Sequence, residues 1–143
     1  MALKSLLLLA LLICLAGVAV LTCSCKSDET PSRVTIHEVT PQEAFDLIQD
    51  NQNNSDFLVI DVRTSVEFAE GHIKGAINID YYRQTFSDEI GNLDRDKTYL
   101  VYCRTGNRST NALHKIEELG FKEIYHLSDG IVTWNEEGLP VVK

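Results

Sequence analysis

Basic residues are scarce in this chain of 143 residues, in which 13 Lys and Arg stand against 21 Asp and Glu. The formal net charge of −8 argues against nucleic acid as a partner, because phosphate contacts need clustered Lys and Arg side chains. An acidic balance of this size otherwise favours solubility and identifies no partner. The chain has no internal repeat and no low-complexity block, and its length is enough for one domain.

Cysteine is also scarce outside the first 25 residues, which contain Cys14, Cys23 and Cys25 and leave Cys103 alone in the rest of the chain. A single cysteine cannot form a disulfide within a domain, whatever the compartment. No spacing of potential metal ligands occurs in that part of the sequence, and the histidines there show no ligand pattern. This holds for His37, His114 and His126.

The one long hydrophobic run lies near the N-terminus, where every residue from Leu6 to Leu21 is apolar, glycine or cysteine. Lys4 precedes the run, and the polar segment 26–33 follows it. A core helix would keep a polar stripe, and a membrane-spanning helix normally needs about 20 apolar residues. The pattern therefore predicts an export signal over residues 1–25 and a polar tether over 26–33, with an uncleaved membrane anchor as the alternative.

The end of this run, Val20-Leu21-Thr22-Cys23-Ser24-Cys25, resembles a bacterial lipoprotein signal, in which an apolar and small-residue box precedes a lipid-modified cysteine. Cys23 is the slightly favoured site of lipidation and Cys25 is the alternative, since Thr22 departs from the pattern for either one. The resemblance implies an exported protein in the periplasm or cell envelope, or on the extracellular face, held at the membrane through its N-terminal segment only.

Residues 34–143 alternate strand-like and helix-like patterns. Short apolar or alternating runs predict strands at 34–39, 57–60, 76–79, 98–102 and 123–127. Apolar periodicity, helix caps and glycine stops predict helices at 41–50, 66–69, 81–90, 107–119 and 131–137. This alternation predicts a single doubly wound α/β domain, with a central parallel sheet of about five strands flanked by helices on both faces.

The most informative segment runs from Cys103 to Ser109 and reads Cys-Arg-Thr-Gly-Asn-Arg-Ser. It joins the expected strand 98–102 to the expected helix 107–119. In such a domain a strand delivers the residue after it to the carboxyl edge of the sheet, where open α/β folds bind their ligands. The sequence therefore places Cys103 in a candidate site.

Several features of this segment favour a negatively charged sulfur. A tight loop containing Gly106 can turn successive backbone N–H groups inward, and the helix N-terminus behind it adds further N–H groups and a partial positive charge. Arg104 and Arg108 add two cations. These features favour the thiolate of Cys103, which is the nucleophilic form. The alternative is a buried, inert thiol, although two arginines and a glycine turn fit a core position poorly.

Three blocks in order along the chain resemble the rhodanese family, whose active loop is a Cys followed by five residues that curl around its sulfur. The middle block is the segment that begins at Cys103. The others are Asp61-Val62-Arg63, Glu67-Phe68 and Gly71-His72-Ile73-Lys74-Gly75-Ala76-Ile77-Asn78 on the N-terminal side, and Gly130-Ile131-Val132-Thr133-Trp134 with Gly138-Leu139-Pro140 on the C-terminal side. The resemblance implies a rhodanese-like domain over residues 34–143.

The resemblance also implies a sulfurtransferase that works in two steps without a metal or an organic cofactor. Cys103 takes the sulfane sulfur of a donor such as thiosulfate as a persulfide, and a thiol, cyanide or a protein acceptor then removes it. Two of the loop residues, Arg104 and Arg108, would also orient the anionic donor. The loop residues implied to hold the transferred sulfur are Arg104, Thr105, Gly106, Asn107, Arg108 and Ser109.

Four conspicuous residues outside the loop are expected to serve the fold. In the family, Asp61 and Arg63 mainly hold the structure together near the site. His72 belongs to a turn motif, and sulfur transfer from a thiolate needs no base. Trp134 is expected to pack rather than to contact substrate.

Two other functions remain open. Cysteine phosphatases and arsenate reductases require five residues between Cys and Arg, whereas four separate Cys103 from Arg108, and Tyr102 replaces the His that commonly precedes the phosphatase cysteine. The other is a persulfide carrier for a partner protein, or a non-catalytic binding or sensing module on the same fold. Inactive relatives usually lose the Cys or the loop Arg, and this sequence keeps both.

Overall fold

The computed structural model describes residues 34–143, and the predicted export signal, the tether, Cys23 and Cys25 lie outside them. The strands are β1 Thr35–Val39, β2 Phe57–Asp61, β3 Ala76–Asn78, β4 Thr98–Tyr102 and β5 Glu123–Leu127. The helices are α2 Pro41–Asp50, α3 Ser65–Glu70, α4 Phe86–Gly91, α5 Asn107–Leu119 and α6 Gly130–Glu136. Among the residues described, no helix has the length and apolar character to cross a membrane.

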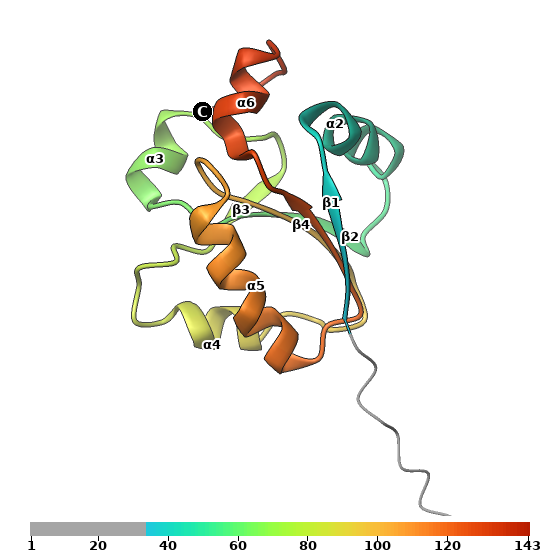
Figure 1. Cartoon of the computed structure of the whole chain (residues 1–143), viewed down its shortest axis with the longest axis vertical. Coiled ribbons are helices and arrows are strands. Elements are labelled where there is room, and N and C mark those ends of the chain that lie inside the picture. The colour runs from blue at the N-terminus through green and yellow to red at the C-terminus, as the bar shows by residue number, and fades with distance from the viewer. Residues whose placement is uncertain (1–33) are drawn as a thin grey trace, which may run out of the picture.

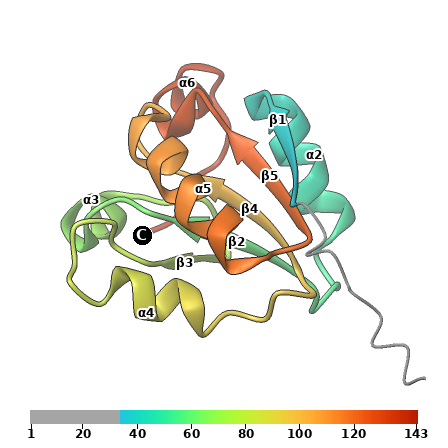
Figure 2. The same ribbon diagram turned by 60° about the horizontal axis from the view of Figure 1, so that its bottom comes forward.

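The five strands form one parallel sheet in the order β1-β5-β4-β2-β3 (Figures 1 and 2). The chain runs outward from β2 to β3, returns to β4 beside β2, and then runs the other way to β5. The strand order therefore reverses between β2 and β4, and the carboxyl ends of strands at such a reversal are where open α/β sheets bind ligands. Cys103 follows the last residue of β4 and thus lies at this point.

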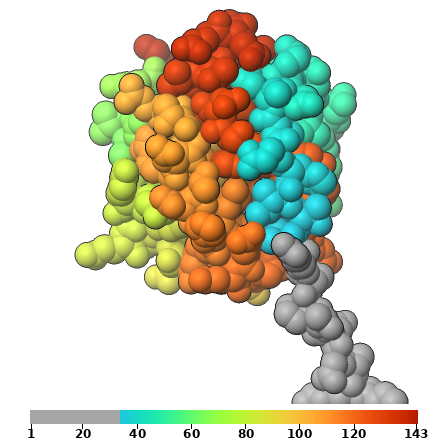
Figure 3. All heavy atoms as spheres, in the orientation of Figure 1, coloured from blue at the N-terminus to red at the C-terminus, as the bar shows by residue number. Residues whose placement is uncertain are grey.

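The sheet is covered on both faces by apolar side chains from helices, which confirms the predicted doubly wound architecture. One buried cluster includes Phe86 and Ile90 of α4 and Ile116 of α5. The other includes Ala44 of α2 and Trp134 of α6. The helices surround the sheet in both ribbon views, and the space-filling view shows a closed surface over α5 (Figure 3).

The indole of Trp134 is 1% exposed, and its N–H donates to the carbonyl of Pro140 at 3.2 Å. Trp134 therefore packs in the core, as expected from the sequence.

Most elements begin and end within a residue or two of their predicted bounds, and α4 is the main exception. The sequence predicts an irregular helical stretch from residue 81, whereas α4 begins at Phe86. The preceding residues turn around Asp80, whose side chain accepts the N–H of Tyr82 and whose carbonyl accepts that of Arg83, each at 3.0 Å. An aspartate that bonds the backbone two residues ahead favours a turn over a helix.

Candidate active site

A short loop links Cys103 at the end of β4 to the first residue of α5, Asn107. Gly106 in this loop has a φ of 88°, a conformation that L side chains rarely adopt. A Cβ atom at this position would also overlap the carbonyl oxygen of Ser128, which follows β5. Only glycine lets the loop close against the neighbouring strand end in this way.

The N-terminus of α6 holds the same loop from the other side. The N–H of Ile131 donates to the carbonyl of Cys103 at 2.9 Å, and that of Val132 donates to the carbonyl of Arg104 at 3.1 Å. Gly130, with a φ of 68°, allows this approach, because a Cβ there would overlap the Arg104 carbonyl group. These two carbonyls are turned toward α6, which leaves the inner side of the loop to N–H groups.

Those N–H groups surround the sulfur of Cys103. The backbone N–H groups of Ser109, Thr105 and Arg108 lie close enough to the sulfur to lower the pKa of the thiol, and the Ser109 hydroxyl donates to the sulfur at 3.4 Å. Burial raises the pKa of the Cys103 thiol, but these four donors outweigh it, and the pKa is lowered overall. The arrangement is therefore the anion-binding nest that the loop sequence predicts.

Cys103 is 1% exposed and belongs to the same buried apolar cluster as Val62 and Val101. By contrast, three residues of the loop, Arg104, Thr105 and Asn107, are exposed. The sulfur thus lies beneath a polar surface, with apolar side chains on one side and peptide N–H groups on the other. An inert core thiol would be surrounded by apolar side chains and would have no peptide N–H groups around its sulfur.

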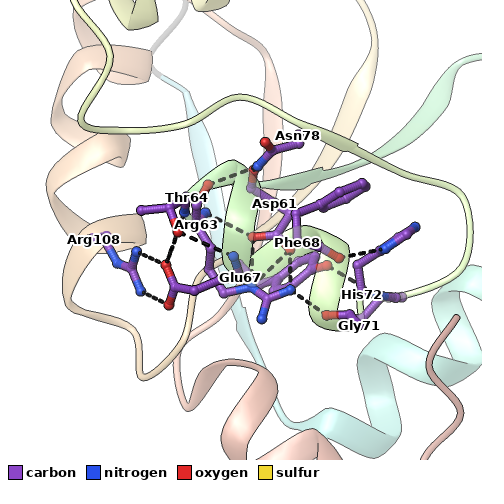
Figure 4. Close-up of polar contacts among 11 residues, drawn as sticks. Asp61, Arg63, Thr64, Glu67, Phe68, Gly71, His72, Asn78 and Arg108 are labelled. Carbon is purple, nitrogen blue, oxygen red and sulfur yellow. Dashed lines mark hydrogen bonds and ion pairs between the residues drawn. The ribbon is translucent and has the colours of Figure 1, made fainter. Parts of the chain in front are cut away.

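The two loop arginines differ in their surroundings. Arg108 donates to both carboxylate oxygens of Glu67, at 2.6 and 2.7 Å (Figure 4), and lies 5.7 Å from the ring centre of Tyr82. The hydrogen bond from Arg108 is the largest cause that lowers the pKa of Glu67 to about 2. Arg104 is exposed and makes no ion pair with the residues that the structure describes. The cation open to an incoming anion is therefore Arg104.

Glu67 is a site residue whose partner the sequence does not reveal. It lies in the first turn of α3 and forms a capping box, in which its carboxylate accepts the backbone N–H and hydroxyl of Thr64 at 3.0 and 2.8 Å. The Thr-x-x-Glu spacing is a readable signal for this cap. The ion pair with Arg108 spans 41 residues of sequence, so only the folded structure shows it.

Asp61 and Arg63 form a buried ion pair beside the site, with 2.7 Å between Nη2 and Oδ2 (Figure 4). Arg63 also donates to the carbonyl of Gly71 at 2.6 Å, and Asn78 donates to the carbonyls of Asp61 and Arg63 at 3.0 and 2.8 Å. Burial lowers the pKa of Arg63, but the hydrogen bond and charge of Asp61 raise it by more. The pair thus joins the end of β2 to the end of α3, and Asn78 joins β3 to the same segment.

His72 is held by local contacts. Its Nδ1 atom lies 3.0 Å from the carbonyl oxygen of Phe68, and the two rings stack with 3.7 Å between their centres. Its backbone pairs with Val142 near the end of the chain. The two side-chain contacts belong to the turn in which the sequence places His72, and the backbone pairing ties that turn to the C-terminal segment.

The structure adds two residues, His126 and Glu38, that the sequence does not single out. His126 is 1% exposed, and its Nε2 atom lies 2.8 Å from the hydroxyl oxygen of Ser109. Its Nδ1 atom lies 3.0 Å from a carboxylate oxygen of Glu38. A histidine at an inward position of a buried strand is the available sequence signal. Its partners come from β1 and α5, which only the sheet topology brings together.

In the part of the chain that the structure describes, two surface hollows are lined by no residue of the loop. One, of about 410 Å³, includes Tyr82, whose ring centre lies 5.7 Å from the Arg108 guanidinium, together with Arg83 and Lys115. The other, of about 420 Å³, is lined by residues such as Phe45, Ile73 and Trp134 and by none from the loop. The first hollow is therefore the nearer to the loop, and both of its cations have partners, since Lys115 pairs with Glu118 and Arg83 donates to the Ser65 hydroxyl.

Comparisons with known proteins agree with the fold. Residues 40–137 match the family model described as "Rhodanese-like domain". A sulfurtransferase of Allochromatium vinosum is 27% identical over 107 residues, which cover 75% of this chain and 95% of that protein. The rhodanese-related protein of Thermoplasma volcanium, a solved crystal structure, is 32% identical with a TM-score of 0.60, and the match covers 74% of this chain and 97% of that one.

A longer relative contains the same region as one part. The probable adenylyltransferase/sulfurtransferase MoeZ of Mycobacterium tuberculosis is 31% identical over 118 residues. The match covers 82% of this chain but 29% of that protein.

Proposed function

The chain belongs to the rhodanese-like domain family and resembles sulfurtransferases, and from this premise we propose that it transfers sulfane sulfur through a persulfide on Cys103. The observation that carries the proposal is the surroundings of the Cys103 sulfur, to which the Ser109 hydroxyl donates at 3.4 Å while three backbone N–H groups of the loop and of α5 lower the pKa of the thiol. Donors in fixed positions stabilise a negative charge without having to reorient during the reaction.

In the first step the thiolate of Cys103 attacks the outer sulfur of a donor such as thiosulfate. A new S–S bond forms to Cys103, and the donor's own S–S bond breaks with its electron pair leaving on sulfite. The product is a Cys103 persulfide that carries one negative charge on its outer sulfur. Covalent catalysis of this kind divides one transfer into two easier ones.

The loop supports both the thiolate and the persulfide. The N–H groups of Thr105, Arg108 and Ser109, together with the N-terminus of α5, favour a negative charge on the sulfur that Cys103 carries. Arg104, at the exposed surface above the sulfur, attracts the anionic donor. Arg108 holds the loop through Glu67 rather than binding the donor directly.

In the second step a nucleophilic acceptor, either a thiolate or cyanide, attacks the outer sulfur of the persulfide. The S–S bond to Cys103 breaks and its electron pair returns to Cys103 as a thiolate. The acceptor leaves as a persulfide or as thiocyanate. No electron is lost or gained overall, so the cycle needs no redox cofactor.

Intact-mass spectrometry after exposure to thiosulfate tests the proposal. The wild-type protein is expected to gain the mass of one sulfur atom, and to lose it again when cyanide is added. Cys103→Ser is expected to gain nothing under the same conditions. An adduct that persists in Cys103→Ser contradicts the assignment, and phosphate-ester hydrolysis in place of sulfur uptake would favour the phosphatase alternative.

We also propose that the chain acts outside the cytoplasm, held at a membrane by its N-terminal segment. Support comes from the apolar run Leu6–Leu21, the preceding Lys4, and the cysteines at 23 and 25. The sulfur donor and acceptor would then be small molecules or proteins of that compartment.

A further inference from the structure

A continuous chain of hydrogen bonds joins the buried sulfur to the surface. From Cys103 it passes to the Ser109 hydroxyl at 3.4 Å, then to Nε2 of His126 at 2.8 Å, and from Nδ1 of His126 to Glu38 at 3.0 Å. The four residues come from the end of β4, from α5, from β5 and from β1, the elements that adjoin one another in Figure 2.

Exposure changes abruptly along this chain. Cys103 is 1% exposed, and the side chain of His126 is 2% exposed, whereas that of Glu38 is 63% exposed. A proton that leaves the Cys103 thiol therefore has little direct contact with water. The hydrogen-bonded chain supplies a route from the sulfur to a carboxylate in solvent.

The Ser109 hydroxyl also lies 2.8 Å from the carbonyl oxygen of Gly106, which competes with the sulfur and with His126 for the single hydroxyl proton. That carbonyl accepts the N–H of Thr110 at 2.8 Å in any case, so it keeps a donor when the Ser109 proton points along the chain. Both end states of a proton transfer along the chain can then be drawn as follows. With a thiol, Cys103 donates to Ser109, Ser109 donates to Nε2 of His126, and Nδ1–H donates to Glu38. With a thiolate, Ser109 donates to the sulfur, Nε2–H donates to Ser109, and Nδ1–H still donates to Glu38. The same heavy-atom positions serve both states, so the transfer needs no rearrangement.

We propose that Ser109, His126 and Glu38 form a proton relay that holds the proton of Cys103 while the sulfur is a thiolate. This inference deepens the proposed function and rests on Cys103 as its nucleophile. The S–H bond breaks and its proton goes to the Ser109 oxygen, while the original Ser109 proton goes to Nε2 of His126. The electron pair remains on sulfur, and the imidazolium is balanced by Glu38.

The charged groups around the His126 imidazole fit the proposed relay. The hydrogen bond from His126 is the largest cause that lowers the pKa of the Glu38 carboxyl, so that Glu38 is an anion at neutral pH. On α5, Arg108 is paired with Glu67. The remaining ionisable side chains on β1, β5 and α5 are paired at the surface or are tyrosines, namely His37 with Glu123, His114 with Glu117, Lys115 with Glu118, and Tyr125 beside Glu123.

In this scheme Ser109 touches the reacting atom, whereas His126 and Glu38 act through it as positioning residues. The rate at which iodoacetamide alkylates Cys103, measured against pH, reports the thiolate directly. His126→Gln keeps a side chain that can hydrogen-bond to Ser109 but cannot hold the extra proton. The matched control is His37→Gln on exposed β1.

The alkylation midpoint is expected to rise by about one pH unit in His126→Gln, since an opposite charge near the sulfur is lost, and to stay unchanged in His37→Gln. Because residue 38 lies at the surface, Glu38→Gln provides the same test if His126→Gln does not fold. Its midpoint is also expected to rise, because the imidazolium loses its counter-charge. An unchanged midpoint in these variants, or a fall in Glu38→Gln as expected from simple removal of a negative charge, overturns the relay.

A double-mutant comparison tests the path through Ser109. Ser109→Ala is expected to raise the midpoint, and adding His126→Gln to it is expected to cause no further rise. If adding His126→Gln to Ser109→Ala raised the alkylation midpoint as much as His126→Gln does alone, His126 would act without Ser109. That result would overturn the relay. Alkylation does not require sulfur transfer, so a wild type that shows the relay but gains no sulfur from thiosulfate would count against the proposed function alone.

Discussion

Arg108 and Glu67 form a two-pronged ion pair that ties the first turn of α5 to the first turn of α3 (Figure 4). The pair turns an arginine of the loop that follows Cys103 away from solvent and toward α3. It also fixes the N-terminal end of α5, from which two of the N–H groups at the sulfur come.

Glu67→Gln is expected to reduce the free energy of unfolding at neutral pH by about 1–2 kcal/mol, because it removes a charge-assisted pair that is only partly screened by solvent. Urea denaturation measures this change. Glu70→Gln, at the exposed end of the same helix, is the control and should be nearly neutral. The rate of sulfur uptake from thiosulfate is also expected to fall in Glu67→Gln, because the loop loses its anchor.

The same pair predicts a pH dependence of stability. The pKa of Glu67 falls from an ordinary 4.5 to about 2 in the folded protein, so the stabilisation is fully present above 4.5. It is lost as pH falls from 4.5 toward 2, where the folded protein takes up the proton. Denaturation at a series of pH values should show the difference between wild type and Glu67→Gln shrinking across this window, and a difference that stays constant would contradict the assignment.

The contact between α6 and the loop gives a prediction with a close control. Gly130 and Gly138 have similar φ angles, 68° and 72°, so alanine is strained at both, by about 1–2 kcal/mol. Only at Gly130 would the new Cβ overlap the Arg104 carbonyl, while Gly138 has open space. Gly130→Ala is therefore expected to raise the alkylation midpoint of Cys103 and slow sulfur uptake, and Gly138→Ala to change neither.

The buried pair of Asp61 and Arg63 is expected to matter for stability far more than for chemistry. Arg63→Met leaves the Asp61 carboxylate buried without its partner, at an expected cost of about 3–5 kcal/mol in unfolding free energy. Arg95→Met, at an exposed arginine, is the control. If Arg63→Met were as stable as wild type but unable to take up sulfur, the structural role would be wrong.

The N-terminal proposal has its own measurement. Expression of the full chain in a bacterium, followed by mass analysis of the mature N-terminus, is expected to show cleavage before a lipid-modified Cys23 or Cys25. Cys23→Ser and Cys25→Ser then identify which residue carries the lipid. An intact, unmodified N-terminus at Met1 would contradict both lipidation and cleavage.

Sequence patterns gave the bounds of β4 and α5 without error, because a buried apolar run, a glycine turn and a glycine stop all agree there. They also placed Cys103 at the carboxyl edge of the sheet. They missed the start of α4, where a side-chain turn at Asp80 competes with the helix. They could not show that His126 meets Ser109, because this contact depends on how β5 packs against α5, and no local pattern encodes that packing.

The account depends on one physical claim, that peptide N–H groups and the Ser109 hydroxyl keep a buried sulfur negatively charged. The most direct test is the alkylation rate of Cys103 in the wild-type domain as a function of pH. The account predicts a midpoint below that of an ordinary thiol, about 8.5. A midpoint at or above this value would show that burial outweighs the donors, and would contradict the claim.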